Sequence, residues 1–172
     1  MAYYDIYVTA LMHHAGVIDF AGSQGRCALG ASGVTEAKSE GDGATPLGRF
    51  PLRRVWYRPD RWEAPVCPLP IVEISQKSGW SDDIHDPDYN RPVVRPHGYG
   101  HEQLWRQDHL YDVFLELGYN DQPAVAGKGS AIFLHLEKND YQATRGCVAV
   151  DEAMMRHILA HISLETMINI TQ

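Results

Sequence analysis

The chain has little of three features that mark common classes of protein. Basic residues are few: 15 lysines and arginines against 22 acidic residues give a net charge of −7, whereas proteins that bind nucleic acids or anionic membranes present basic faces. No apolar run approaches the roughly 18 residues of a membrane-spanning segment. The apolar residues 8–12 end at His13 and His14, too soon for the core of an export signal. We therefore expect neither a nucleic-acid partner nor insertion into a membrane.

Cysteine is also scarce. The chain contains three, Cys27, Cys67 and Cys147, too few for a disulfide-built scaffold. Its 172 residues, 44% of them hydrophobic, suffice to bury one core without such bridges, so residues 1–172 are expected to form a single domain. Cys27 and Cys67 are expected to be packing residues that pair with each other only in an oxidising compartment. Cys147 would then be the thiol left over.

The strongest chemical signal is the sequence Thr144-Arg145-Gly146-Cys147, which follows His135 in the apolar run of residues 131–136. A cysteine acts as a nucleophile when a nearby base favours its thiolate. A preceding glycine lets the backbone approach the substrate and aim N–H groups at a developing oxyanion. The pattern predicts an acyl-transfer site with Cys147 as nucleophile, His135 as base and the N–H groups of Gly146 and Cys147 as oxyanion donors. An inert cysteine buried at a strand end is the alternative interpretation.

Two motifs resemble a known family. His135 followed by residues 144–147 resembles the catalytic signature of the L,D-transpeptidase (YkuD-like) domain, in which a histidine precedes a Ser/Thr-x-Gly-Cys element. Residues 41–50 resemble that family's Thr-Pro-x-Gly-x-Phe segment. The resemblance extends from about Ala28 to the C-terminus. It implies a mainly β fold of mixed α/β content, a single-domain β-sandwich of curved mixed sheets with one C-terminal helix, and it implies that residues 41–50 pack near the active site.

The resemblance also implies an activity. The chain is expected to be a cysteine-dependent L,D-transpeptidase that joins a donor peptidoglycan stem peptide to an acceptor stem and uses no cofactor. L,D-carboxypeptidase activity, D-amino-acid exchange on muropeptides and a catalytically silent peptidoglycan-binding module are the alternatives. Because mature stems are met outside the inner membrane, we expect a monomer that works in the periplasm or cell envelope, although residues 1–20 show no export signal.

One position departs from the family pattern. The family usually carries an arginine two residues after the cysteine, and this chain has Ala149 there. Arg145 is the nearest substitute, and a guanidinium at that point is expected to grip the donor's carboxylate in bidentate fashion. Arg91 and Arg95 are remoter candidates for the same role.

Further substrate contacts are expected from two polar stretches. Thr144 and Tyr141, just before the cysteine, can each supply a hydroxyl group. Residues 79–90 are too polar and turn-rich for a regular element, and long loops are commonly functional. Tyr89 and Asn90 would act there as donors to the substrate. The alternative is a solvated turn cluster capped by its own aspartates.

No metal site is expected. His97 and His101 are spaced as zinc ligands on a helix would be, but Gly98 and Gly100 argue against a helix there. The aspartates of residues 79–90 lack the ordered ligand pattern of a calcium loop.

Alternating and β-branched patterns predict a strand-rich chain. The expected strands cover residues 5–9, 16–22, 25–30, 49–57, 70–75, 111–117, 130–136 and 165–170. Residues 130–136 are apolar on both faces and predict a central strand with His135 at its exit. Asp151 can cap a helix whose apolar stripe, including Met154 and Met155, faces the core. A second, short helix is expected near residues 101–105.

Overall fold

The structure is a computed structural model that describes residues 4–172. The strands of its main sheet are β1 (Ile6–Ala10), β2 (Ala15–Phe20), β3 (Ser23–Ala28), β6 (Gly48–Tyr57), β7 (Ile71–Glu73), β11 (Val113–Leu117), β12 (Phe133–Leu136), β13 (Val148–Val150) and β14 (Met167–Thr171). Smaller sheets are formed by β8 (Ser78–Ser81), β9 (Pro92–Val94) and β10 (His101–Gln103), and by β4 (Val34–Thr35) and β5 (Thr45–Pro46). Within residues 4–172 there is one helix, α1 (Glu152–His161), and no helix long and apolar enough to cross a membrane.

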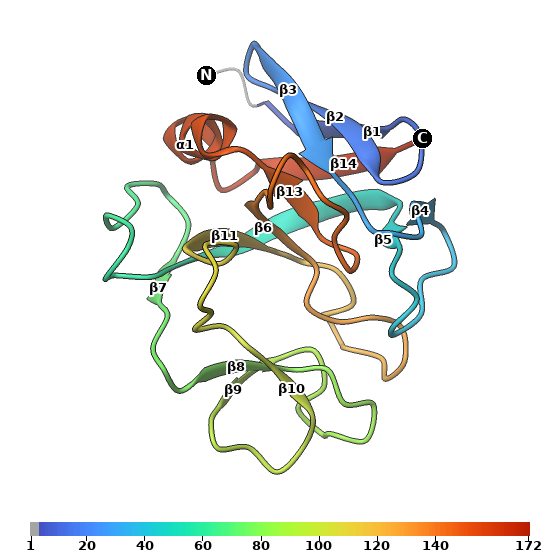
Figure 1. Ribbon diagram of the computed structural model, residues 1–172, viewed down its shortest axis with the longest axis vertical. Coiled ribbons are helices and arrows are strands. Elements are labelled where there is room, and N and C mark those ends of the chain that lie inside the picture. Colours follow the sequence, from blue (N-terminus) through green and yellow to red (C-terminus); the bar gives the residue numbers. More distant parts are fainter. Residues whose placement is uncertain (1–3) are drawn as a thin grey trace.

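The main sheet folds back on itself. Its strand order is β11-β12-β13-β3-β2-β1-β14-β6-β7, and β11 additionally pairs with β6. In Figure 1, β1, β2, β3 and β14 accordingly lie above β6 and β11 as a second layer. The main core lies between these layers and also receives the buried face of α1, including Met154 and Met155. The expected mainly β sandwich of curved mixed sheets with one C-terminal helix is confirmed.

Local sequence explains the elements that carry the site. Residues of β12 are buried on both faces, as the apolar run of residues 130–136 predicts. Those of β11 are also buried on both faces, although Glu116 interrupts the apolar pattern of residues 111–117. The helix begins where expected, because the carboxylate of Asp151 accepts the Met154 N–H at 2.7 Å and so caps the first turn.

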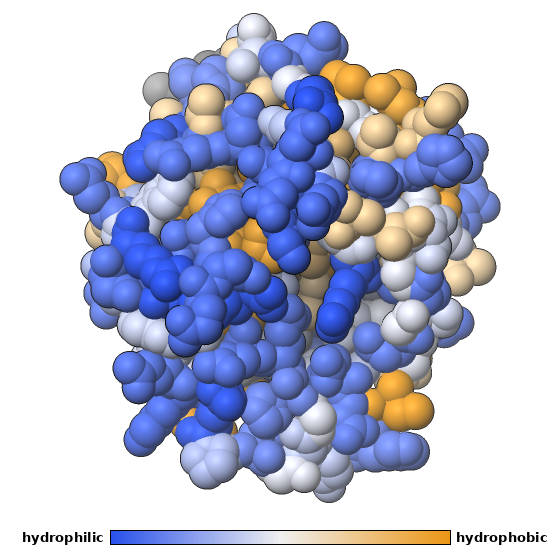
Figure 2. All heavy atoms as spheres, in the orientation of Figure 1, coloured by the Kyte–Doolittle hydropathy of each residue, from blue (hydrophilic) through white to orange (hydrophobic). Residues whose placement is uncertain are grey.

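On the face shown in Figure 2, hydrophilic residues predominate and apolar residues form separate small patches.

A second, aromatic core covers the outer face of the sheet. Its members are Trp56, Ile74, Trp80, Leu104, Tyr111, Phe114, Phe133 and Cys147. Phe114 stacks on Phe133 with ring centroids 4.4 Å apart, and Trp80 meets Phe133 edge-on at 5.0 Å. Trp80 belongs to the small sheet β10-β8-β9, which lies at the bottom of Figure 1. Residues 74–111 therefore form a cover over this face of the main sheet.

The prediction of a short helix near residues 101–105 is wrong. His101–Gln103 form the strand β10, in which His101 pairs with Ser81 of β8. The following residue, Leu104, is fully buried in the second core. Pairing with a neighbouring strand and burial of one side chain outweigh the local helix preference of this short segment.

Residues 79–90 are partly regular, contrary to expectation, because residues 79–81 belong to β8. The remainder is a turn cluster held by its own aspartates. The carboxylate of Asp83 accepts the N–H of His85 at 3.0 Å, and that of Asp86 accepts the N–H of Asp88 at 2.8 Å. These contacts agree with the alternative interpretation, in which this segment is a turn cluster capped by its own aspartates.

Candidate active site

Adjacent parallel strands bring Cys147 and His135 to one face of the sheet. In the register of β12 and β13, Leu134 pairs with Val148 and His135 pairs with Ala149. Leu134 and Val148 point into the main core, so the residues on either side of them point to the opposite face. Cys147 accordingly lies in the second core, beneath the cover.

The Cys147 side chain is held as a neutral thiol. Its sulfur accepts the Phe133 N–H at 3.4 Å and donates to the Ala131 carbonyl at 3.2 Å. Only 6% of the residue is exposed. Burial raises the pKa of the thiol to about 12, and the carboxylate of Glu102 acts in the same direction. At neutral pH the free protein therefore holds a thiol and not the thiolate that a nucleophile needs.

His135 is oriented by the backbone. Its Nδ1 lies 2.7 Å from the Leu136 carbonyl oxygen. A carbonyl can only accept, so Nδ1 carries the proton and Nε2 carries the lone pair. Burial lowers the pKa of His135 to about 4, and the positive charge of Arg106 adds to this effect. The imidazole is therefore neutral at pH 7, with Nε2 able to accept a proton.

Two threonines fix the loop that carries Cys147. The Thr144 hydroxyl donates to the Cys147 carbonyl at 2.7 Å and accepts the Gly146 N–H at 3.1 Å. The Thr45 hydroxyl, from β5, reaches the same carbonyl at 3.3 Å. Gly146 has a φ of +136°, and a Cβ there would lie 2.8 Å from the Ala44 carbonyl oxygen. Residues 41–50 therefore pack directly on this loop, and Thr45, the threonine of the Thr-Pro-x-Gly-x-Phe segment, is the side chain that makes the contact.

A polar network from the cover adjoins Cys147 and His135. The Tyr111 hydroxyl donates to Glu102 at 2.6 Å, and Arg106 lies 3.8 Å from the same carboxylate. Arg106 is held by two hydrogen bonds to Asp108, at 2.7 and 2.6 Å. The Tyr111 ring packs edge-on against the His135 ring, with centroids 5.4 Å apart. Sequence reasoning missed all of these cover residues, because no motif links them to the cysteine.

The residues expected to contact substrate around the cysteine differ in their surroundings. Arg145 is exposed, and its charge opposes the rise that burial causes in the pKa of Glu102. The Tyr141 hydroxyl donates to Asp151, the N-cap of α1, at 3.1 Å. Arg26 lies 4.5 Å from the centroid of the Tyr141 ring. Arg145 is thus free to meet a substrate, whereas the Tyr141 hydroxyl is engaged at the start of the helix.

Tyr89 and Asn90 are both buried. The Tyr89 hydroxyl donates to Glu40 and accepts the Gly129 N–H at 3.0 Å. The hydrogen-bonding positions of the Asn90 amide are filled within the protein: Oδ1 accepts from Trp80 and Ala131, each at 3.0 Å, and Nδ2 donates to two carbonyls of the 119–120 turn. Asn90 thus fixes Ala131, whose carbonyl holds the Cys147 thiol.

His97 and His101 of the cover are hydrogen-bonded within the cover, and Cys27 and Cys67 lie outside the site. His97 Nε2 lies 2.6 Å from the Asp86 carboxylate, and His101 accepts from Arg95 at 3.2 Å. Within residues 4–172, no group of three or more His, Cys, Asp or Glu side chains is arranged to hold a metal ion. Cys27 and Cys67 are free thiols, and burial raises the pKa of both.

Comparison with known families agrees with the motifs. The family model of the L,D-transpeptidase catalytic domain, YkuD, matches residues 15–170, so the match begins before Ala28. No curated protein sequence matches the chain significantly. Among solved structures, that of Bd1075 from Bdellovibrio bacteriovorus is similar, with a TM-score of 0.49 and 16% identity, over 98% of this chain and 47% of that one. The chain thus spans about half the length of that protein. Since the family model covers most of the chain, the protein belongs to the YkuD family of L,D-transpeptidase catalytic domains.

Proposed function

We propose that this protein is a cysteine-dependent L,D-transpeptidase that acts on peptidoglycan stem peptides, with Cys147 as nucleophile and His135 as base. The observation that carries the proposal is the pairing of a thiol and a tautomer-fixed imidazole on one face of adjacent strands. The Leu136 carbonyl plays the part of the third group that orients the base.

The reaction then proceeds through a thioester. Nε2 of His135 takes the thiol proton as the sulfur attacks the carbonyl between an L-centre and a D-residue of the donor stem. Collapse of the tetrahedral intermediate breaks the peptide bond, and the departing D-amino acid leaves with the proton from His135. An amine of a second stem then attacks the thioester, which gives a cross-link and restores the thiol. Two half-reactions separated by a covalent intermediate give ping-pong kinetics.

The free protein begins this reaction from an uncharged pair. The thiol donates to Ala131 and the imidazole is neutral. In the proposed reaction the thiol therefore releases the Ala131 carbonyl and turns to Nε2, which takes the proton as the sulfur attacks. Because Cys147 and His135 are 6% and 5% exposed, a donor peptide reaches them only when the cover moves aside. Opening and substrate binding replace the buried surroundings that hold the thiol neutral.

The Cys147 N–H is the main oxyanion donor in this scheme. The Gly146 N–H is bound to the Thr144 hydroxyl in the free protein, so it joins the oxyanion hole only if that hydrogen bond is released.

Two arginines share the role of the arginine that the family usually carries at the position of Ala149. Arg106 supplies positive charge next to His135 and Cys147, and the exposed Arg145 is free to bind the donor's carboxylate.

Trapping of the acyl-enzyme tests the chemistry. A carbapenem should add its mass to Cys147 of the native protein, as detected by intact-protein and peptide mass spectrometry. The Cys27→Ser/Cys67→Ser variant should be acylated at the same rate, because neither thiol belongs to the site, and Cys147→Ser should not be acylated. Failure of the native, folded protein to acylate would favour the silent binding module, for which the neutral, buried thiol is the specific observation.

The proposed substrate also sets the compartment. Mature stem peptides lie outside the inner membrane, so we propose that the monomeric protein works in the periplasm or cell envelope. Fractionation of cells that express the native gene tests this proposal. Recovery only in the cytoplasm would instead favour hydrolysis or D-amino-acid exchange on precursors or recycled muropeptides.

A further inference from the structure

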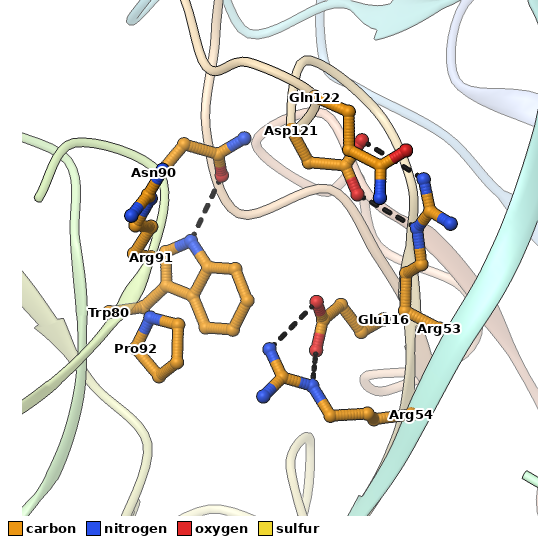
Figure 3. A pocket seen from close by; sticks show the side chains of 9 residues that line it. All are labelled: Arg53, Arg54, Trp80, Asn90, Arg91, Pro92, Glu116, Asp121 and Gln122. Carbon is orange, nitrogen blue, oxygen red and sulfur yellow. Dashed lines mark hydrogen bonds and ion pairs between the residues drawn. The ribbon is translucent and has the colours of Figure 1, made fainter. Parts of the chain in front are cut away.

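A cavity of about 430 Å³ lies beside the active site and has no part in the mechanism above. Its walls come from β6, β8, β9, β11 and the loops after β8 and β11. Three arginines, Arg53, Arg54 and Arg91, converge on it. Figure 3 shows Arg53 and Arg54 on one wall and Arg91 across the cavity, next to the Trp80 indole.

The cavity is on the same face of the sheet as Cys147. Glu116, in its wall, pairs with Phe133 in the register of β11 and β12. The Phe133 N–H in turn donates to the Cys147 sulfur. Neighbouring strands lie about 4.8 Å apart, so two strand spacings place the backbones of Glu116 and Cys147 about 10 Å from each other. That distance corresponds to about three residues of an extended peptide, so one stem peptide can span both places when the cover opens over Cys147 and residues 80–92 stay in the cavity wall.

Two of the arginines are held rigidly by carboxylates. Arg54 binds Glu116 through Nε and Nη2, at 2.7 and 3.0 Å, and Arg53 binds Asp121 through the same two nitrogens, at 2.8 and 3.3 Å. The Trp56 indole also donates to Glu116 at 3.0 Å. These pairs leave the N–H groups of Nη1 on both arginines for a ligand, with their orientation already fixed. Such preorganised guanidinium groups suit planar anions.

The local charge favours an anion with a single negative charge. Two carboxylates offset two of the three arginines, and Arg91 is exposed, with no ion pair to another residue among positions 4–172. The wall therefore carries one excess positive charge in a chain whose net charge is −7. A dianionic phosphate would meet Glu116 and Asp121 as well. A sugar would need an open aromatic face, and Trp80 is 3% exposed with its N–H bound to Asn90.

We infer that this cavity is a second subsite, which binds a carboxylate of the stem peptide while another part of the same peptide lies at Cys147. The inference rests on the proposed function. Arg91 supplies the uncompensated charge, and the fixed Nη1 groups of Arg53 and Arg54 supply further donors. A carboxylate held there positions the donor at a fixed distance from the sulfur, which is a contribution to orientation.

Titration of the Cys147→Ala variant tests the subsite. The probe is a stem tetrapeptide, compared with the same peptide after conversion of its carboxylates to amides, and the readout is the indole N–H resonance of Trp80, assigned with Trp80→Phe. The free peptide should shift this resonance. Amidation of the peptide or the Arg91→Gln change should each raise Kd about tenfold or more, since hydrogen bonds to charged groups are the strong ones. Arg49→Gln, an exposed arginine elsewhere on β6, should leave Kd unchanged.

Several results would overturn the inference: an unshifted Trp80 resonance, equal affinity for the amidated peptide, or a Kd unaffected by Arg91→Gln. A neutral disaccharide that shifts Trp80 independently of Arg91 would assign the cavity to sugar instead. Carbapenem acylation of the native protein separates this question from the chemistry. If acylation fails while the titration behaves as expected, the subsite is supported and the transpeptidase mechanism is rejected. If acylation succeeds and the titration gives one of the contrary results, only the subsite is rejected.

Discussion

At the scale of single residues, Gly146 combines a positive φ with a close backbone neighbour. Its φ of +136° is strained for any L-residue, and a Cβ would press on the Ala44 carbonyl at 2.8 Å. Gly146→Ala is therefore expected to displace the Cys147 N–H and slow acylation about 10²–10³-fold, as measured by mass spectrometry over time. Gly22→Ala is the matched control, because Gly22 also has a positive φ, +80°, but nothing lies within 4 Å of its Cβ position. Acylation of Gly146→Ala at the native rate would contradict the proposed oxyanion geometry.

Arg106 acts on the site through its charge. Apart from burial, which dominates both shifts, its guanidinium lowers the pKa values of His135 and Cys147. Arg106→Gln is therefore expected to raise both pKa values and to move the pH dependence of Cys147 alkylation by iodoacetamide to higher pH. Arg156→Gln, an exposed arginine on α1, should leave the profile unchanged. An unaltered profile in Arg106→Gln would show that Arg106 holds the cover but does not tune the thiol.

At the scale of elements, the sequence indicated the long strands and the helix but not the cover. Alternation over five or more residues, as in β1, and the apolar run of β12 are strong local signals. Strands of two or three residues, such as β5 and β13, carry no pattern of their own and form because their neighbours pair with them. The same reason limits the site: Cys147 and His135 were found from one local motif, whereas Glu102 and Arg106 meet them only through the fold.

Asn90 links the cover to the strand that carries the base. Its amide satisfies Trp80, Ala131 and two carbonyls of the 119–120 turn. Asn90→Ala leaves these groups unpaired and is expected to reduce the free energy of unfolding by at least about 2 kcal/mol, measured by urea denaturation. It should also speed alkylation of Cys147, because Ala131 is no longer fixed. Asn90→Asp keeps the acceptor but sets a buried carboxyl group against the carbonyls of Tyr119 and Asn120, so it should be destabilising as well. Equal stability of Asn90→Ala and the native protein would contradict this role.

At the scale of the whole molecule, the main core stabilises the sandwich, whereas the second core also controls access to Cys147. The main core lies between the layers of the sheet and contains the buried face of α1. The second core joins the cover to the outer face and encloses the thiol. Stability and access to Cys147 are therefore coupled, because exposing the nucleophile separates apolar surfaces that also stabilise the fold.

Burial of His135 makes the folded protein sensitive to acid. The pKa of His135 is about 4 in the folded protein and 6.5 for an unperturbed histidine. As the pH falls, the unfolded chain therefore binds a proton at this residue at a higher pH than the folded protein does. The free energy of unfolding is therefore unaffected by this group above about pH 6.5 and falls as the pH decreases toward 4, by up to about 3 kcal/mol. His135→Gln should show a shallower loss over this window in urea denaturation at successive pH values. Parallel curves for the native protein and His135→Gln would mean that the imidazole titrates normally, and that the site already opens in the folded state.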